Sequence, residues 1–153
     1  MGKFNDRFRS LEESSLDRKC NTRDEKKTKE NLPKIVFSFK DFDTSQIPPG
    51  QSPQEWQDGN LLAYMVEKFG EICKYNIVEA TQQNLIKIYG EFPGNSDFKY
   101  PRTVIQDKKI KWAVIMNIKG QKSRVAGHII DNIFYVVFLD KEHKFFLSQL
   151  KNT

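Results

Sequence analysis

The feature that most constrains the fold is a pair of β-prone runs near the C-terminus, joined by two turn residues. The first run, 124–130, alternates in polarity, and the second, 133–139, is rich in β-branched and aromatic side chains. Asp131 and Asn132 between them suit a two-residue hairpin turn. We therefore expect an antiparallel hairpin whose pairing begins directly at this turn.

The register of this hairpin decides which residues share a face. The pairs that follow from it are Ile130 with Ile133, His128 with Tyr135, Ala126 with Val137, and Arg124 with Leu139. One face is then uniformly apolar, and we expect helices to cover it: Val125, Gly127, Ile129, Phe134, Val136 and Phe138. The other face carries Arg124, His128 and Tyr135 among aliphatic residues, and we expect it to remain open. A shift by one residue would exchange the two faces.

The remaining pattern predicts an α+β domain with the order β-α-α-β-β-β. A strand over 35–42 precedes two helices, one from Ser52 to about residue 75 and one over 79–91. Ser52, Pro53 and Glu55 together mark a helix start. The expected buried face of the first helix is Leu62, Met65, Val66, Phe69, Ile72 and Cys73. A long connection over 93–110 leads to a strand over 111–118 and then to the hairpin. We expect an antiparallel sheet with two helices packed on one face.

Composition divides the chain into two parts. Residues 1–34 are poor in apolar side chains and carry an excess of Lys and Arg, which predicts a polar, basic N-terminal extension that is partly helical or disordered. Residues 35–153 have an ordinary globular composition and are predicted to form one α+β domain. The formal net charge is +5, and the excess of basic residues within the domain falls in residues 107–153. The tail from 140 onward is predicted to extend the last strand and end in a short helix.

Several classes of protein are disfavoured by what the sequence lacks. It has no apolar run long enough for a membrane span and no apolar segment typical of a signal peptide, so we expect a cytoplasmic protein without a membrane partner. Its two cysteines, Cys20 and Cys73, form neither a disulfide framework nor a zinc motif. No phosphate-binding glycine loop or nucleophile elbow occurs. We therefore expect no metal and no cofactor.

The residues expected on the open face suit attack on a phosphodiester. RNA cleavage through its own 2′-hydroxyl needs a proton acceptor, a proton donor and cations that stabilise the charge on phosphorus. We expect Arg124 and Lys122 to stabilise the phosphate, His128 or His143 to act as base or acid, and Tyr135 to assist. The residues expected to bind the RNA chain are Lys111, Lys119, Lys122 and Lys144. The same side chains would also suit a non-enzymatic module that binds RNA or protein, or an ordinary solvated surface.

The segment from Arg124 to His143 also carries a family resemblance. Its basic first strand, apolar second strand and terminal histidine region resemble the closing hairpin of RelE-like toxins, the mRNA interferases of bacterial type II toxin–antitoxin systems. The order β-α-α-β-β-β is similar to theirs as well. The resemblance implies a cytoplasmic endoribonuclease that cleaves mRNA, either on the ribosome or free of it, without a metal. It also implies a cognate antitoxin protein that covers the open face.

Overall fold

The computed structural model describes residues 31–147 of the chain. Contacts divide the chain between Leu32 and Pro33, and the fold below belongs to the second unit. The predicted extension over 1–34 lies outside the described residues except for its last four positions. The described part of the C-terminal tail, 141–147, forms no helix, and residues 148–153 lie outside the described residues.

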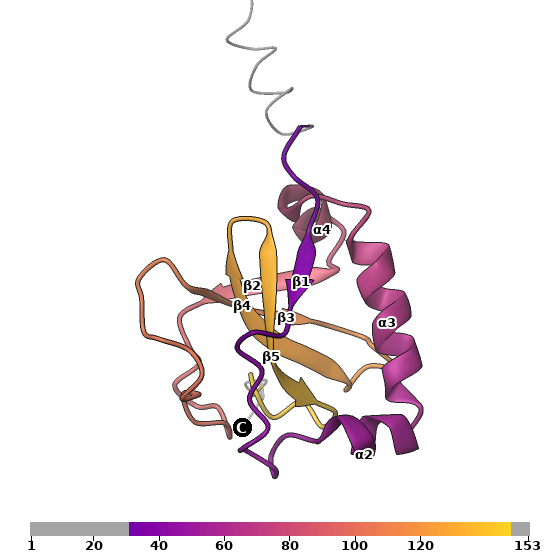
Figure 1. Cartoon of the computed structure of the whole chain (residues 1–153), viewed down its shortest axis with the longest axis vertical. Helices are drawn as coiled ribbons and strands as arrows, with labels where there is room; N and C mark the ends of the chain where they lie inside the picture. Colours follow the sequence, from indigo (N-terminus) through magenta and orange to yellow (C-terminus); the bar gives the residue numbers. More distant parts are fainter. Residues whose placement is uncertain (1–30, 148–153) are drawn as a thin grey trace, which may run out of the picture. The chain divides into compact units, whose positions relative to one another are not determined.

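The described fold is α+β, as predicted, and is built on a five-stranded mixed sheet (Figure 1). The strands are β1 (Val36–Ser38), β2 (Ile86–Gly90), β3 (Lys111–Ile115), β4 (Arg124–Ile130) and β5 (Ile133–Asp140), and their spatial order is β1-β5-β4-β3-β2. The predicted all-antiparallel sheet is wrong at one edge, because β1 runs parallel to β5. No hairpin joins these two strands, so no tight turn forces them into opposite directions.

The helix predicted from Ser52 to residue 75 is two helices, α2 (Pro53–Asp58) and α3 (Leu61–Ile72). Its start is confirmed, since the Ser52 side chain accepts a hydrogen bond from the Glu55 amide at 3.1 Å. The break falls at Asn60, whose φ of 60° is left-handed and cannot continue a helix. The new direction lets both helices bury apolar side chains. Of the predicted buried face, Met65, Phe69 and Ile72 are buried, Leu62 is half-buried, and Val66 and Cys73 are exposed.

The helix predicted over 79–91 is wrong in its second half. The chain forms the short helix α4 (Ile77–Gln82) and then the edge strand β2. A capping box between Asn76 and Glu79 starts α4, and a left-handed Asn84 turns the chain after it. The alternating residues 86–89 then pair with β3 in antiparallel register.

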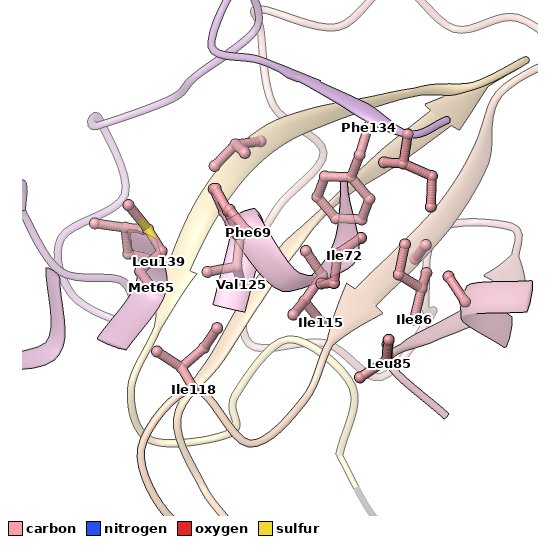
Figure 2. Close-up of a cluster of buried hydrophobic side chains, with 14 of the residues drawn as sticks. Met65, Phe69, Ile72, Leu85, Ile86, Ile115, Ile118, Val125, Phe134 and Leu139 are labelled. Atoms are coloured by element: carbon pink, nitrogen blue, oxygen red, sulfur yellow. The ribbon is translucent and has the colours of Figure 1, made fainter. Parts of the chain in front are cut away.

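The three helices within residues 31–147 all contribute to one hydrophobic core on one face of the sheet. Figure 2 shows side chains of α3, among them Met65, Phe69 and Ile72, beside residues of the strands. The Phe37 ring of β1 stacks on Phe69 at 3.9 Å, which joins the N-terminal strand to α3. The helix-covered face is therefore the face predicted to be buried.

The opposite face of the sheet is not open, and this corrects the prediction. It carries a second core, which the connection over 91–110 and the segment over 141–147 supply with aromatic side chains. Its buried members are Phe98, Val104, Trp112, Val114, Ala126, Val137, Phe138 and Phe145. The long connection is thus a packed layer that leaves only parts of the face accessible.

The hairpin register is as predicted near the turn and shifted beyond it. Ile130 pairs with Ile133 and His128 with Tyr135, but a β-bulge opposite Gly127 moves Ala126 onto Phe138 and Arg124 onto Asp140. The bulge turns Phe138 into the second core instead of the helix-covered core. Gly127 permits this approach, because an added Cβ would lie 2.8 Å from the Phe134 ring and closer still to the Tyr135 carbonyl oxygen.

Candidate functional site

The site residues predicted on the hairpin fall into two groups on the same face of the sheet. Alternation along β4 places Arg124, Ala126 and His128 on the side of the second core. Arg124 and His128 are four residues apart, about 13 Å along an extended strand. Ala126 between them is buried in the second core. The two side chains therefore belong to separate sites.

The first group is centred on Arg124, the first residue of β4 and the cross-strand partner of Asp140. The Arg124 charge acts on Asp140, His143 and Tyr89, which come from the end of β5, the turn after it and the edge strand β2. We call these four residues the arginine–histidine cluster. Within residues 31–147, the Arg124 Nε is buried and has no hydrogen-bond partner. A buried donor without a partner is costly, and an anion that entered beside the guanidinium would satisfy it.

Asp140 supports the turn that carries His143. Its carboxylate is buried, and its two oxygens accept hydrogen bonds from the backbone amides of Lys144 at 2.8 Å and Phe145 at 2.9 Å. Burial raises the pKa of Asp140, while these hydrogen bonds and the charges of His143 and Arg124 oppose the rise. Asp140 makes no ion pair within 4.0 Å of Arg124.

His143 has the electrostatic surroundings of a proton acceptor. It is half-buried, and burial lowers its pKa below the ordinary value of 6.5. The positive charge of Arg124 lowers the pKa of His143 further, whereas Asp140 and a backbone hydrogen bond with Phe146 raise it. The neutral imidazole is therefore favoured near pH 7, and a neutral imidazole can accept a proton.

Tyr89, like Asp140, is a member of the cluster that sequence reasoning missed. Its ring stacks on Phe146 at 3.9 Å, and the Lys87 Nζ lies 5.2 Å from its centroid. Burial raises the pKa of Tyr89, against the charge of Arg124 and a side-chain hydrogen bond with it, so the phenol stays protonated at neutral pH. Since β3 lies between β2 and β4, Arg124 reaches across β3 to make this contact. The alternation of apolar and polar residues over 86–89 could have indicated the strand that carries Tyr89. It was instead interpreted as part of a helix.

The second group is centred on His128, which is 1% exposed and not on an open surface. Its Nε2 lies 3.0 Å from the Asp41 Oδ2, its ring stacks on Tyr135 at 4.6 Å, and the Trp112 ring lies edge-on at 5.6 Å. Asp41 is 87 residues away in sequence, so no local pattern could have indicated this pair. Tyr135 is thus a neighbour of His128 as predicted, whereas Asp41 was not expected.

Burial also determines the protonation of His128. It lowers the pKa of His128, while the hydrogen bond and charge of Asp41 raise it and the charge of Lys40 lowers it. The Nδ1 is buried and has no hydrogen-bond partner among the described residues. A cleft of about 360 Å³ borders this group, with Tyr135 and Asp41 in its lining. The enclosed imidazole links β4 to the loop after β1, and it also lines this cleft.

The four lysines predicted to bind RNA are all exposed but do not share one surface. Lys119 lies in the loop before β4, and its Nζ is 5.1 Å from the Tyr64 ring of α3, on the helix side. Lys122 follows in the same loop. Lys111 begins β3 on the side of the helix-covered core. Lys144 directly follows His143, which makes it the nearest of them in sequence to the arginine–histidine cluster.

Residues 31–147 contain neither a cluster of metal-binding side chains nor a membrane-spanning helix. No three His, Cys, Asp or Glu side chains there are grouped as a metal site requires. No described helix is long and apolar enough to cross a membrane. Comparisons with protein-family models, with curated proteins and with solved structures found no match.

Proposed function

We propose that the protein is an endoribonuclease that cleaves RNA through its 2′-hydroxyl at the arginine–histidine cluster. In this mechanism His143 accepts the proton of the 2′-hydroxyl, which attacks the adjacent phosphorus. Arg124 stabilises the negative charge that develops on the phosphate oxygens. Tyr89 or a water molecule donates a proton to the leaving 5′-oxygen. The products are a 2′,3′-cyclic phosphate and a 5′-hydroxyl, so no further reactant is needed.

The observation that carries this proposal is the convergence of three complementary side chains from separate elements. Arg124 comes from β4, His143 from the turn after β5, and Tyr89 from β2. The unpartnered Nε of Arg124 suits a phosphate, and the lowered pKa of His143 keeps its imidazole neutral for use as a base. The Tyr89 phenol holds the proton that the leaving oxygen needs, although its raised pKa makes it a weaker acid. Each role that the reaction requires has one candidate within the cluster.

We further propose that this chemistry belongs to a RelE-like toxin acting on mRNA in the cytoplasm. Helices on one face of a sheet and a basic, imidazole-bearing site on the other support this proposal. An antitoxin would then act by covering the arginine–histidine cluster, because the second core already fills much of the remaining face. Of the residues predicted from the sequence, Arg124 and His143 keep a role in this mechanism. Tyr89, which was not predicted, is added to them.

The test combines growth with cleavage by the purified full chain. Expression of the protein should arrest growth, and the protein should cut naked RNA or mRNA on translating ribosomes in the presence of EDTA. Arg124→Ala and His143→Ala should each lower the rate at least about 100-fold. The exposed Lys74→Ala, after the end of α3, removes one charge elsewhere and should have no effect.

Two results would contradict this proposal. Normal growth at a confirmed expression level, with RNA intact in both assays, would exclude the nuclease. Salt-dependent RNA binding without turnover would identify the non-enzymatic binding module instead.

A further inference from the structure

His143 has a backbone conformation that is uncommon for residues other than glycine. Its φ of 61° lies in the left-handed region. Such a conformation persists at a non-glycine residue only where the surrounding structure fixes it. Because the backbone restricts the direction of the side chain, the contacts that hold the turn after β5 also decide where the imidazole lies.

Three groups hold this turn through hydrogen bonds to its backbone. The Asp140 carboxylate accepts from two of the amides. The Asp97 amide donates to the Lys144 carbonyl oxygen at 3.1 Å. The third group is Gln51, in the loop between β1 and α2, whose side-chain Oε1 accepts from the Lys141 amide at 2.7 Å. Since Lys141 lies two residues before the histidine, this bond fixes the turn just ahead of the imidazole.

The Gln51 side chain is itself held in one orientation. Its Oε1 also accepts from the indole N–H of Trp56 at 3.0 Å, and Trp56 is fully buried in α2. Its Nε2 donates to the Pro49 carbonyl oxygen at 3.0 Å. The Gln51 backbone amide donates to the Leu139 carbonyl oxygen at 3.2 Å, which ties the same loop to the end of β5. An amide that is bonded at both its oxygen and its nitrogen keeps the Lys141 amide in one place.

We propose that Gln51 is a positioning residue for His143, an inference that rests on the proposed function. It acts through the turn, because its bond is to the Lys141 backbone. Arg124 comes from β4, so its place does not depend on this bond. Loss of the bond should displace the base and leave the phosphate-stabilising group where it is. A displacement of about 1 Å can slow a reaction about 100-fold.

The first measurement is the rate of RNA cleavage by the full chain. Gln51→Ala removes the acceptor and should lower kcat about 10- to 100-fold with KM little changed. Gln51→Glu keeps an acceptor oxygen and should retain most of the activity. The matched control is Ser52→Ala, the next residue in the chain, which removes the hydrogen bond that caps α2. This variant should lose stability but keep the kcat of the unchanged protein.

The second measurement needs no RNA and follows the His143 imidazole by NMR below the melting temperature of each variant. Burial and the charge of Arg124 lower the pKa of His143, and they outweigh Asp140 and the backbone of Phe146, which raise it. An imidazole that leaves these surroundings should titrate at a higher pH, closer to 6.5. We expect this upward shift of the midpoint in Gln51→Ala.

The outcomes separate this inference from the proposed function. An unchanged His143 midpoint in Gln51→Ala overturns the inference whether or not RNA is cleaved. A loss of kcat that is equally large in Ser52→Ala also overturns it, because lower stability alone would then slow the reaction. If the unchanged protein cuts no RNA, the proposed function fails, and the midpoint decides whether Gln51 holds the turn.

Discussion

Gly127 is the position at which one added methyl group should do the most damage. It lies in β4 opposite the bulge of β5, and the bulge decides which residues face each core. In Gly127→Ala the new Cβ would lie 2.8 Å from the Phe134 ring and 3.0 Å from the Tyr135 carbonyl carbon. Both distances are well inside ordinary van der Waals contact, and the nearest atom belongs to the Tyr135 backbone. Because the backbone of a central strand cannot move aside alone, β4 and β5 must separate locally.

The size of the effect follows from this geometry. Overpacking of a core costs about 1–3 kcal/mol when side chains can adjust. Here hydrogen-bonded backbone must shift, so we expect at least the upper value, a loss of about 3 kcal/mol or more in the free energy of unfolding. For a domain of this size the melting temperature should fall by roughly 10 °C.

Urea denaturation followed by circular dichroism measures this loss. The matched control is Gly70→Ala on the exposed side of α3, where an added Cβ meets nothing within 4 Å. Alanine in a helix should stabilise the protein by about 0.5–1 kcal/mol. If Gly127→Ala lost less than about 1 kcal/mol, the strands would not approach each other as described, and the assignment of Phe138 to the second core would fail with it.

Two further predictions concern ionisable groups. Burial lowers the pKa of His128, so the unfolded chain binds more protons than the folded one between that lowered pKa and 6.5, and stability should fall as the pH drops through this window. Asp41→Asn removes the charge that raises this pKa, so the His128 imidazole signals in NMR should titrate at a lower pH than in the unchanged protein; an equal or higher midpoint would contradict the contact. Asp140→Asn leaves one carbonyl oxygen where two carboxylate oxygens accept from the turn, and should cost about 1–3 kcal/mol in urea denaturation and slow RNA cleavage by displacing His143. Unchanged stability and cleavage in Asp140→Asn would show that Asp140 does not support the turn that carries His143.

The parts of the fold that were predicted correctly depend on local sequence patterns. The hairpin turn at Asp131–Asn132, the pairing of His128 with Tyr135 and the start of α2 at Ser52 each depend on residues within a few positions of one another. The errors in the predicted helices also have local causes. The left-handed Asn60 interrupts an otherwise continuous helical pattern, and the alternation over 86–89 resembles a helix face when read with the residues before it.

The candidate site was only half predictable. Arg124 and His143 stood out as basic and imidazole residues at the ends of the hairpin, and both belong to the arginine–histidine cluster. Their separation from His128 depends on the second core, whose cover comes from a connection without helix or strand and therefore without periodicity. Tyr89 and Asp41 reach their partners across 35 and 87 residues of chain, distances over which sequence spacing carries no information.

By itself, the amino-acid sequence determined the α+β class, the hairpin and its turn, and the apolar face that the helices cover. These follow from side-chain periodicity and turn chemistry, which act within one element. Only the tertiary structure decided that the opposite face is largely filled, that His128 is enclosed and that Arg124 faces Asp140. Those outcomes depend on a bulge between two largely apolar strands and on aromatic side chains from a distant connection. No residue pattern within either strand marks the bulge, so packing across the whole domain decides the register.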